Sequence, residues 1–153
     1  MRRALATFFY IGRLPVAPGT AASICAWALA VVIVRADAPS WVLGVLAVGV
    51  AGLGAILARH AFEDFGEEDP PSFVLDEVAG TLLAISFLPI ASAQAGFWLG
   101  VLALVLFRAF DILKPPPCRF LETLPHGIGV MADDLAAGLM ANVATQIVSF
   151  VTG

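Results

Sequence analysis

The chain has 153 residues, of which 60% are hydrophobic and only 13% charged, and its formal net charge is −4. Soluble domains contain roughly 45–50% apolar and about 25% charged residues, so this composition excludes an ordinary soluble domain and indicates a membrane protein. The length suggests one domain over residues 1–153. The two cysteines, Cys25 and Cys118, form no CxxC motif and indicate no disulfide framework.

Five apolar runs follow one another along the chain. They cover residues 20–34, 41–58, 78–91, 95–107 and 135–151. A membrane-spanning helix needs about 20 predominantly apolar residues, so the third and fourth runs are short for a span. These two runs fit either a tight hairpin that turns at residues 92–94 or a partly re-entrant pair. We therefore expect an all-α bundle of four to five short transmembrane helices.

The charged residues are concentrated in three polar stretches, which are residues 1–19, 59–77 and 108–134. Loops on the cytoplasmic side of a membrane carry an excess of lysine and arginine, so we expect the three stretches on that side. With five spans, the C-terminus would then lie on the opposite side of the membrane. A cleaved signal peptide ending at Ala36-Asp37-Ala38 is the competing interpretation. We disfavour it because the first apolar run starts only near residue 20 and is longer than a usual signal sequence.

The first polar motif, "GRLPVAPGT" at residues 12–20, precedes an apolar helix. Proline and glycine impose turns, and Thr20 is a fair N-cap. The motif is either an ordinary helix start or a rigid loop whose N–H groups and Thr20 meet an anion.

The second motif, "DPPSFVLDEVAG" at residues 69–80, places Asp76 and Glu77 before small apolar residues. The helix dipole favours carboxylates at this position. A carboxylate inside the bilayer is nevertheless costly, so a pair followed by Gly80 also suggests a cation held between helices.

The third motif, "FRAFDILKPPP" at residues 107–117, spaces Arg108, Asp111 and Lys114 three apart, on one broad helix face. The prolines that follow end the helix. One interpretation is an Arg108–Asp111 ion pair with Lys114 reaching to the headgroups. The other is a cationic phosphate clamp beside a metal-ligand carboxylate.

The fourth motif, "GIGVMADDLAAG" at residues 127–138, supplies Asp133 and Asp134. Helix capping explains one aspartate better than two, and Gly138 allows a neighbouring helix to approach closely. His60 and His126 are isolated and receive no role, and Glu122 has an ordinary ion-pair spacing to Arg119.

On the expected topology these motifs face one side of the membrane. Five carboxylates with two or three cations, and no cysteine–histidine cluster, suit Mg²⁺ better than zinc. At headgroup depth, such a site fits a phosphorylated lipid headgroup.

In their order along the chain, "LPVAPGT", "DPPSFVLDEVAG", "FRAFDILKPPP" and "GVMADDLAAG" resemble the motifs of the phosphatidylglycerophosphatase A family, over roughly residues 12–140. The resemblance implies a Mg²⁺-dependent phosphatase that converts phosphatidylglycerophosphate to phosphatidylglycerol in glycerophospholipid biosynthesis. It also implies a multi-pass protein of the bacterial cytoplasmic (inner) membrane. The expected partners are this lipid and the bilayer, without nucleic acid. Ala22 departs from the expected pattern, where we would expect glycine.

Site residues follow from the resemblance by position. As catalytic residues it implies Asp76, Glu77, Asp111, Asp133 and Asp134, of which all but Asp111 would hold the metal. Arg108, Lys114 and Thr20 would bind the substrate phosphate. Two rival functions stay open, which are a small transporter or ion pathway that uses the carboxylates and another lipid-headgroup phosphotransferase. Clustering on one face disfavours the first, and the absence of a D-x-x-D-G-x-x-A-R pattern disfavours the second.

Overall fold

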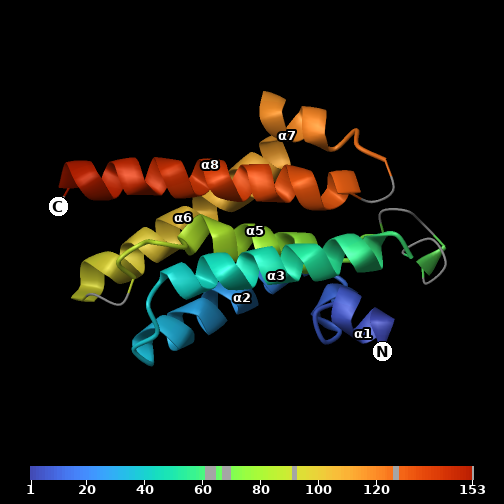
Figure 1. Cartoon of the computed structure of the whole chain (residues 1–153), viewed down its shortest axis with the longest axis horizontal. Coiled ribbons are helices and arrows are strands. Elements are labelled where there is room, and N and C mark those ends of the chain that lie inside the picture. The colour runs from blue at the N-terminus through green and yellow to red at the C-terminus, as the bar shows by residue number, and fades with distance from the viewer. Residues whose placement is uncertain (61–64, 67–69, 91–92, 126–127, 153) are drawn as a thin grey trace.

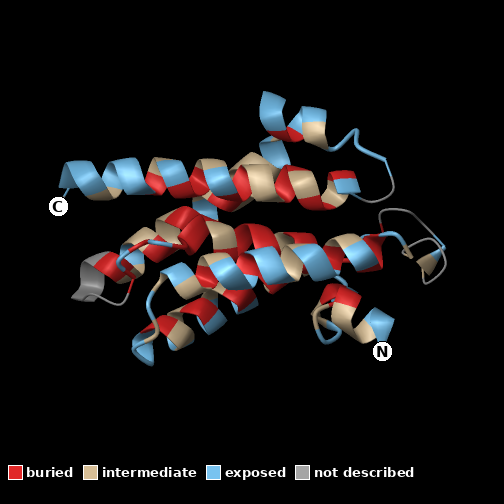
Figure 2. Ribbon diagram, in the orientation of Figure 1, coloured by how far each residue is buried: buried red, intermediate tan, exposed pale blue. Residues whose placement is uncertain are grey.

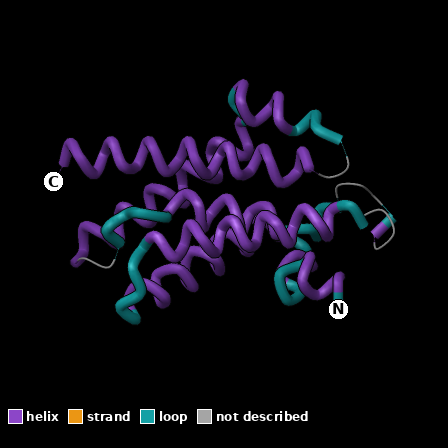
Figure 3. The backbone as a smooth tube through the Cα atoms, in the orientation of Figure 1, coloured by secondary structure: helices purple, strands orange, loops and turns teal. Residues whose placement is uncertain are grey.

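The computed structural model describes residues 1–60, 65–66, 70–90, 93–125 and 128–152, and the regular elements in these ranges are all helical (Figure 3). This confirms the expected all-α class. Two short elements come first, α1 (Arg2–Ala6) and the 3-10 helix η1 (Ile11–Arg13). The remaining helices are α2 (Pro18–Arg35), α3 (Trp41–Ala58), α5 (Leu75–Ile85), α6 (Ala93–Leu113), α7 (Pro116–Leu121) and α8 (Ile128–Thr152).

Four of these helices are long and apolar enough to cross a membrane, namely α2, α3, α8 and residues 96–113 of α6. Their outer faces carry exposed apolar side chains such as Val48, Val105 and Phe150. In a membrane protein such side chains face lipid. The described chain is therefore a polytopic helical bundle, at the lower end of the expected four to five spans.

Helix α6 corrects one expectation. The apolar run at residues 95–107 looked short, but the helix continues to Leu113. Arg108 and Asp111 lie in this continuation and pair with each other one turn apart, at 2.7 Å, so neither charge is left without a partner. The helix then ends before Pro115, as the proline run predicts.

Helix α5 is enclosed by the long helices. Its 11 residues correspond to about 16 Å at about 1.5 Å per residue, well short of a bilayer core of about 30 Å. All of them except Glu77 and Leu83 are buried, and α5 packs against α8, α3 and α2 (Figure 2). The third apolar run is thus a short interior helix rather than a full span. The expected turn at residues 92–94 lies partly outside the described residues, and its described part is wrong because Ala93 and Gln94 already belong to α6.

The C-terminal end of α5 is held by a side chain of α8. Asn142 donates hydrogen bonds to the carbonyl oxygens of Ala84 and Ser86, at 3.0 and 2.7 Å. These bonds satisfy carbonyl groups that the end of a helix leaves without partners. The helix can therefore end inside the bundle without unpaired backbone at these two positions.

The chain direction places the polar segments at one end of the bundle. The N-terminus, the segment before α5, α7 and the first turns of α8 lie toward one end, and the C-terminus lies at the other (Figure 1). The expected grouping of the polar stretches is confirmed for their described residues.

Helices α5 and α8 approach each other closely at two glycines. A Cβ atom on Gly138 would lie 2.4 Å from the carbonyl oxygen of Gly80, and one on Gly80 would lie 2.8 Å from that of Asp134. The role predicted for Gly138 is confirmed. This contact brings the first turns of α8 beside the start of α5, where the acidic residues lie.

Candidate active site

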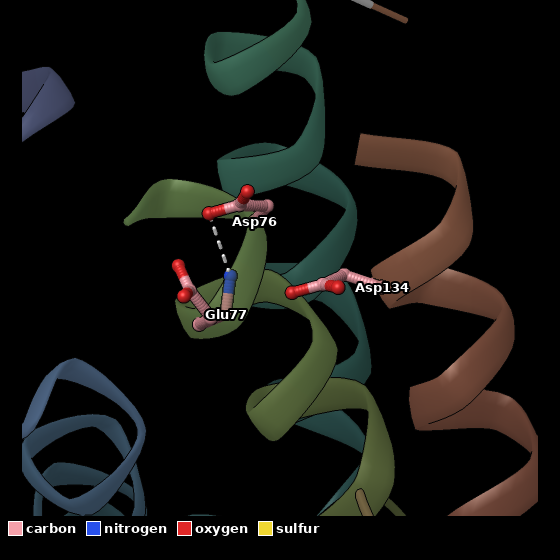
Figure 4. Close-up of side chains that lie close together, drawn as sticks. All are labelled: Asp76, Glu77 and Asp134. Atoms are coloured by element: carbon pink, nitrogen blue, oxygen red, sulfur yellow. Dashed lines mark hydrogen bonds between the residues drawn. The ribbon is translucent and has the colours of Figure 1, made fainter. Parts of the chain in front are cut away.

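Three carboxylates meet where α5 begins and α8 passes it. Asp76 and Glu77 come from the first turn of α5 and Asp134 from α8 (Figure 4). One carboxylate oxygen from each residue lies within 4.8 Å of the other two. Asp76 and Asp134 are only 8% and 4% exposed. We call these three residues the acidic cluster.

The acidic cluster is not neutralised by hydrogen bonds within itself. Asp76 Oδ1 accepts the backbone N–H of Glu77 at 3.0 Å. Among the described residues, the buried oxygens Glu77 Oε2 and Asp134 Oδ2 have no hydrogen-bond partner. Buried charges are normally paired or coordinate metals, so three close carboxylates with two unpartnered oxygens fit a bound cation. All ligand atoms are hard oxygens, which suit Mg²⁺.

The start of α2 touches the acidic cluster from another side. A Cβ atom on Gly19 would lie 1.8 Å from Glu77 Oε1 and 2.7 Å from its carboxyl carbon. The Glu77 carboxylate therefore lies directly against the α2 backbone, and a side chain at Gly19 would displace this carboxylate. Thr20 is the next residue, but it is not the expected N-cap, because α2 begins at Pro18 after Ala17. Thr20 is also not among the described residues that line the cavity around the acidic cluster.

Arg108 and Asp111 of α6 form the ion pair that the third motif suggested. The Arg108 Nη1 atom lies 2.7 Å from Asp111 Oδ2 and 3.8 Å from Glu77 Oε1. Arg108 Nε is buried and has no hydrogen-bond partner among the described residues. The guanidinium thus lies beside the acidic cluster and keeps a free donor.

Lys114 directly follows α6, and its side chain binds two carboxylates of the site. This differs from the interpretation in which Lys114 reaches only to the lipid headgroups. Its Nζ donates to Asp133 Oδ2 at 2.9 Å and to Glu122 Oε1. Partial burial lowers the pKa of Lys114, but the bonds to Glu122 and Asp133 outweigh burial and hold this pKa above its ordinary value. Lys114 therefore stays charged and ties the end of α7 to the start of α8.

The two adjacent aspartates have different partners. Successive residues on an α-helix point about 100° apart, so Asp133 and Asp134 cannot face the same point equally. Asp134 joins Asp76 and Glu77, whereas Asp133 bonds to Lys114. The expected four-residue metal set is thus divided by the structure into a cluster of three and a lysine partner.

A cavity of about 170 Å³ lies beside the acidic cluster, Asp111, Asp133 and Lys114, whereas Arg108 is not among its described lining residues. Its described lining contains six carboxylate residues and one lysine, together with Pro70, Pro71, Phe73 and Val130; the charged residues are Asp76, Glu77, Asp111, Lys114, Glu122, Asp133 and Asp134. Six acidic groups against one lysine in the wall would repel a phosphate unless cations are bound as well. The arrangement suits a cation and a phosphate that bind together.

Sequence reasoning missed Glu122. We expected it to pair with Arg119, one turn earlier in the chain, but its carboxylate bonds to Lys114 and lines the cavity. Its spacing of eight residues from Lys114, across three prolines, gave no signal for this contact. His60 lies at the end of α3, with Nδ1 3.0 Å from the carbonyl oxygen of Ile56, and His126 lies outside the described residues.

Comparisons with known proteins identify the family of this chain. Residues 4–149 match the family described as Phosphatidylglycerophosphatase A. A Phosphatidylglycerophosphatase A from Haemophilus influenzae is 33% identical over 95% of this chain and 87% of its own, and one from Escherichia coli is 34% identical over 90% and 77%. A "Putative phosphatidylinositol-3-phosphatase" from Bacteroides thetaiotaomicron is 32% identical over 97% and 94%. No solved structure matches the chain significantly.

Proposed function

The chain belongs to the phosphatidylglycerophosphatase A family and is a lipid phosphatase, and from this premise we propose that it hydrolyses phosphatidylglycerophosphate. Water attacks the terminal phosphomonoester, the bond between phosphorus and the glycerol oxygen breaks, and phosphatidylglycerol and phosphate leave. This reaction would serve glycerophospholipid biosynthesis. The single observation that carries the proposal is the acidic cluster in a cavity that also holds Lys114, because this combination suits a metal-bound phosphate.

We propose that Mg²⁺ binds to Asp76, Glu77 and Asp134. Three observations support this fit. All ligand atoms are hard oxygens, one oxygen from each residue lies within 4.8 Å of the other two, and two of the carboxylate oxygens have no hydrogen-bond partner among the described residues. When bound, Mg²⁺ would offset the carboxylate charge and polarise the phosphoryl oxygens. Asp133, which we had expected as a fourth ligand, is better suited to hold Lys114, since its carboxylate already accepts a bond from this lysine.

The two cations have complementary parts in binding the phosphate. The free Nε–H of Arg108 can donate to a phosphoryl oxygen while Asp111 fixes the guanidinium. Lys114 lines the cavity and supplies a second positive charge. Phosphomonoester hydrolysis is among the slowest uncatalysed reactions, so charge stabilisation and positioning must supply most of the acceleration. One cavity carboxylate accepts the proton of the attacking water.

We also propose that Thr20, which lies in the first turn of α2, contacts the substrate phosphate. Gly19, its neighbour, already lies against Glu77, so a headgroup beside the acidic cluster comes near the N–H groups of this helix start. The acyl chains would remain in the bilayer beside the long helices. We propose that the polar end faces the cytoplasm, from the positive residues in the polar stretches, and that the membrane is the bacterial inner membrane.

The location of the charges disfavours an ion pathway. A pathway needs polar groups at mid-depth, whereas the acidic cluster comes from the first turn of α5 and the first turns of α8, and these helix starts lie toward the end of the bundle that holds the N-terminus (Figure 1).

The test is phosphate release by the purified protein in detergent, with Mg²⁺ or with EDTA, from phosphatidylglycerophosphate and from phosphatidylinositol 3-phosphate. We expect release from the first lipid with Mg²⁺ and none with EDTA. Asp134→Asn should reduce turnover by about 100-fold or more, as expected for a loss of several kcal/mol of charge stabilisation. Asp37→Asn is the matched control, since Asp37 is exposed beyond the far end of α2.

Each outcome has a definite meaning. Turnover close to normal in a folded Asp134→Asn protein would remove Asp134 from the site. Release from phosphatidylinositol 3-phosphate alone would overturn the proposed substrate but keep the lipid phosphatase. Equal release with EDTA would overturn the role of Mg²⁺.

A further inference from the structure

Glu122 has a place in the cavity that the proposed reaction does not yet use. Its carboxylate and that of Asp133 hold the ammonium group of Lys114 from two different segments, α7 and α8. We propose that Glu122 is a positioning residue, which holds Lys114 so that this lysine meets the phosphate of the lipid substrate. The proposal deepens the proposed function and rests on it, because it takes Lys114 as a phosphate contact.

The geometry of Lys114 explains why a second anchor is needed. A lysine side chain has four rotatable carbons and three N–H donors that have no fixed direction. Nζ bonds to Asp133 Oδ2 at 2.9 Å and to Glu122 Oε1 as well. Two donors are thus directed by carboxylates, and the third remains for a substrate oxygen. With Asp133 alone, the ammonium could rotate about one contact and lose this orientation.

The two anchors differ in exposure. The Asp133 side chain is 6% exposed, the Lys114 side chain 33% and the Glu122 side chain 46%. A half-exposed ion pair contributes little to stability, about 1 kcal/mol or less. Stability alone therefore does not account for a carboxylate that lines the cavity, whereas orientation of the substrate contact does.

The backbone at Glu122 is held independently of its side chain. A Cβ atom on Gly129 would lie 2.4 Å from the carbonyl oxygen of Glu122, so this backbone lies directly on the first turn of α8. The Glu122 N–H also donates to the carbonyl oxygen of Cys118, at 3.0 Å, and Cys118 is buried. A change of the Glu122 side chain should therefore leave α7 in place, which makes the residue testable.

The experiment is a double-mutant cycle on the full chain in detergent with Mg²⁺. The variants are Glu122→Gln, Lys114→Ala and the double variant, with Asp37→Asn as the charge-matched control. KM and kcat for phosphatidylglycerophosphate are measured, together with inhibition by inorganic phosphate. Thermal unfolding checks that each variant is folded.

We expect Glu122→Gln to raise KM and the inhibition constant of phosphate about threefold to fivefold, with kcat nearly unchanged, as for loss of one partly exposed charge contact. In the Lys114→Ala background the same change should have no further effect, because Glu122 acts through Lys114. Glu122→Asp, which keeps the charge, should restore part of the loss. The control should match the unchanged protein.

Two results would overturn the proposal. Additive effects of Glu122→Gln and Lys114→Ala would mean that Glu122 does not act through the lysine. A lower KM in Glu122→Gln would mean that the carboxylate competes with phosphate for Lys114 instead of orienting it. Failure of the proposed function would look different, since the unchanged protein would then release no phosphate from the lipid. Direct binding of inorganic phosphate, measured by calorimetry on the same variants, would still report the coupling between Glu122 and Lys114.

Discussion

Gly138→Ala tests whether the contact between α5 and α8 sets the geometry of the acidic cluster. The substitution adds one methyl group and touches none of the residues proposed to bind metal or phosphate. The added Cβ would lie 2.4 Å from the carbonyl oxygen of Gly80 and 3.1 Å from the carbonyl carbon and Cα of that residue. These are backbone atoms, so no side-chain rotation can relieve the overlap.

The size of the effect follows from these distances. Ordinary van der Waals contact begins near 3.4 Å, so the 2.4 Å approach requires the helices to separate by about 1 Å (3.4 − 2.4). Overpacking of this kind costs about 1–3 kcal/mol. Asp134 lies one turn before Gly138, and Asp76 one turn before Gly80, so the same separation would widen the acidic cluster. A misplacement of about 1 Å at a reacting centre can reduce turnover by about 100-fold.

The assays are thermal unfolding in detergent and phosphate release from the lipid substrate. Gly49→Ala is the matched control, because Gly49 is also a helical glycine of a long helix and a Cβ there would meet no atom within 4 Å. We expect the control to keep its activity and to unfold at the same temperature or slightly above, since alanine favours helix over glycine. A Gly138→Ala protein with normal stability and turnover would refute the argument that this contact fixes the site.

Three further predictions concern single contacts. Asn142→Leu leaves the carbonyl groups of Ala84 and Ser86 without their donor and should destabilise the fold by about 1–3 kcal/mol in thermal unfolding; unchanged stability would mean that the end of α5 is held otherwise. Arg108→Lys loses the planar donor fork and should raise KM about tenfold, whereas an unchanged KM would remove Arg108 from the phosphate site. Burial raises the pKa of the Cys118 thiol, and nearby carboxylates add to this, so a maleimide at neutral pH should label it only after unfolding. Because Cys25 is exposed, the test uses a Cys25→Ser background, in which labelling of the folded protein, read by mass, would contradict the burial of Cys118.

Sequence reasoning located the membrane helices because a bilayer constrains length and polarity strongly. The four long helices coincide with apolar runs, and the polar motifs lie toward one end, as expected. Helix ends were less predictable. The apolar run of α6 stopped at Arg108 and looked short for a span, although the third motif already predicted a helix through Arg108 and Asp111 that ends at the prolines, and α6 includes both residues. The early end of α5 depends on Asn142, which is 56 and 58 residues away from the groups it binds.

The candidate site was predictable as a set of residues but not as a set of contacts. The motifs identified the residues of the acidic cluster, and the structure brings Asp76, Glu77 and Asp134 together. The spacing of the residues could not show that Asp133 binds Lys114. The sequence of two adjacent aspartates is the same whether the first or the second of them faces the neighbouring helix. Nor could the spacing pair Glu122 with Lys114, since the turn between them depends on how α7 packs on α8.

The register of α5 against α8 connects the fold to the site. On α8, Asp134, Gly138 and Asn142 are spaced by four residues and therefore share one face. They meet, in the same order, Asp76, Gly80 and Ala84 of α5: the carboxylates in the acidic cluster, the glycines in backbone contact, and the amide on a carbonyl oxygen.

The two helices run in the same direction (Figure 1), so each matched pair is separated by 58 residues in the chain, as the Asn142–Ala84 bond is. A slide of one helix along the other would break all three contacts together. The Asn142 amide, the two glycines and the carboxylates thus all depend on the position of α5 along the axis of α8. It follows that Asn142→Leu, although it is two turns from Asp134, should reduce metal-dependent turnover as well as stability.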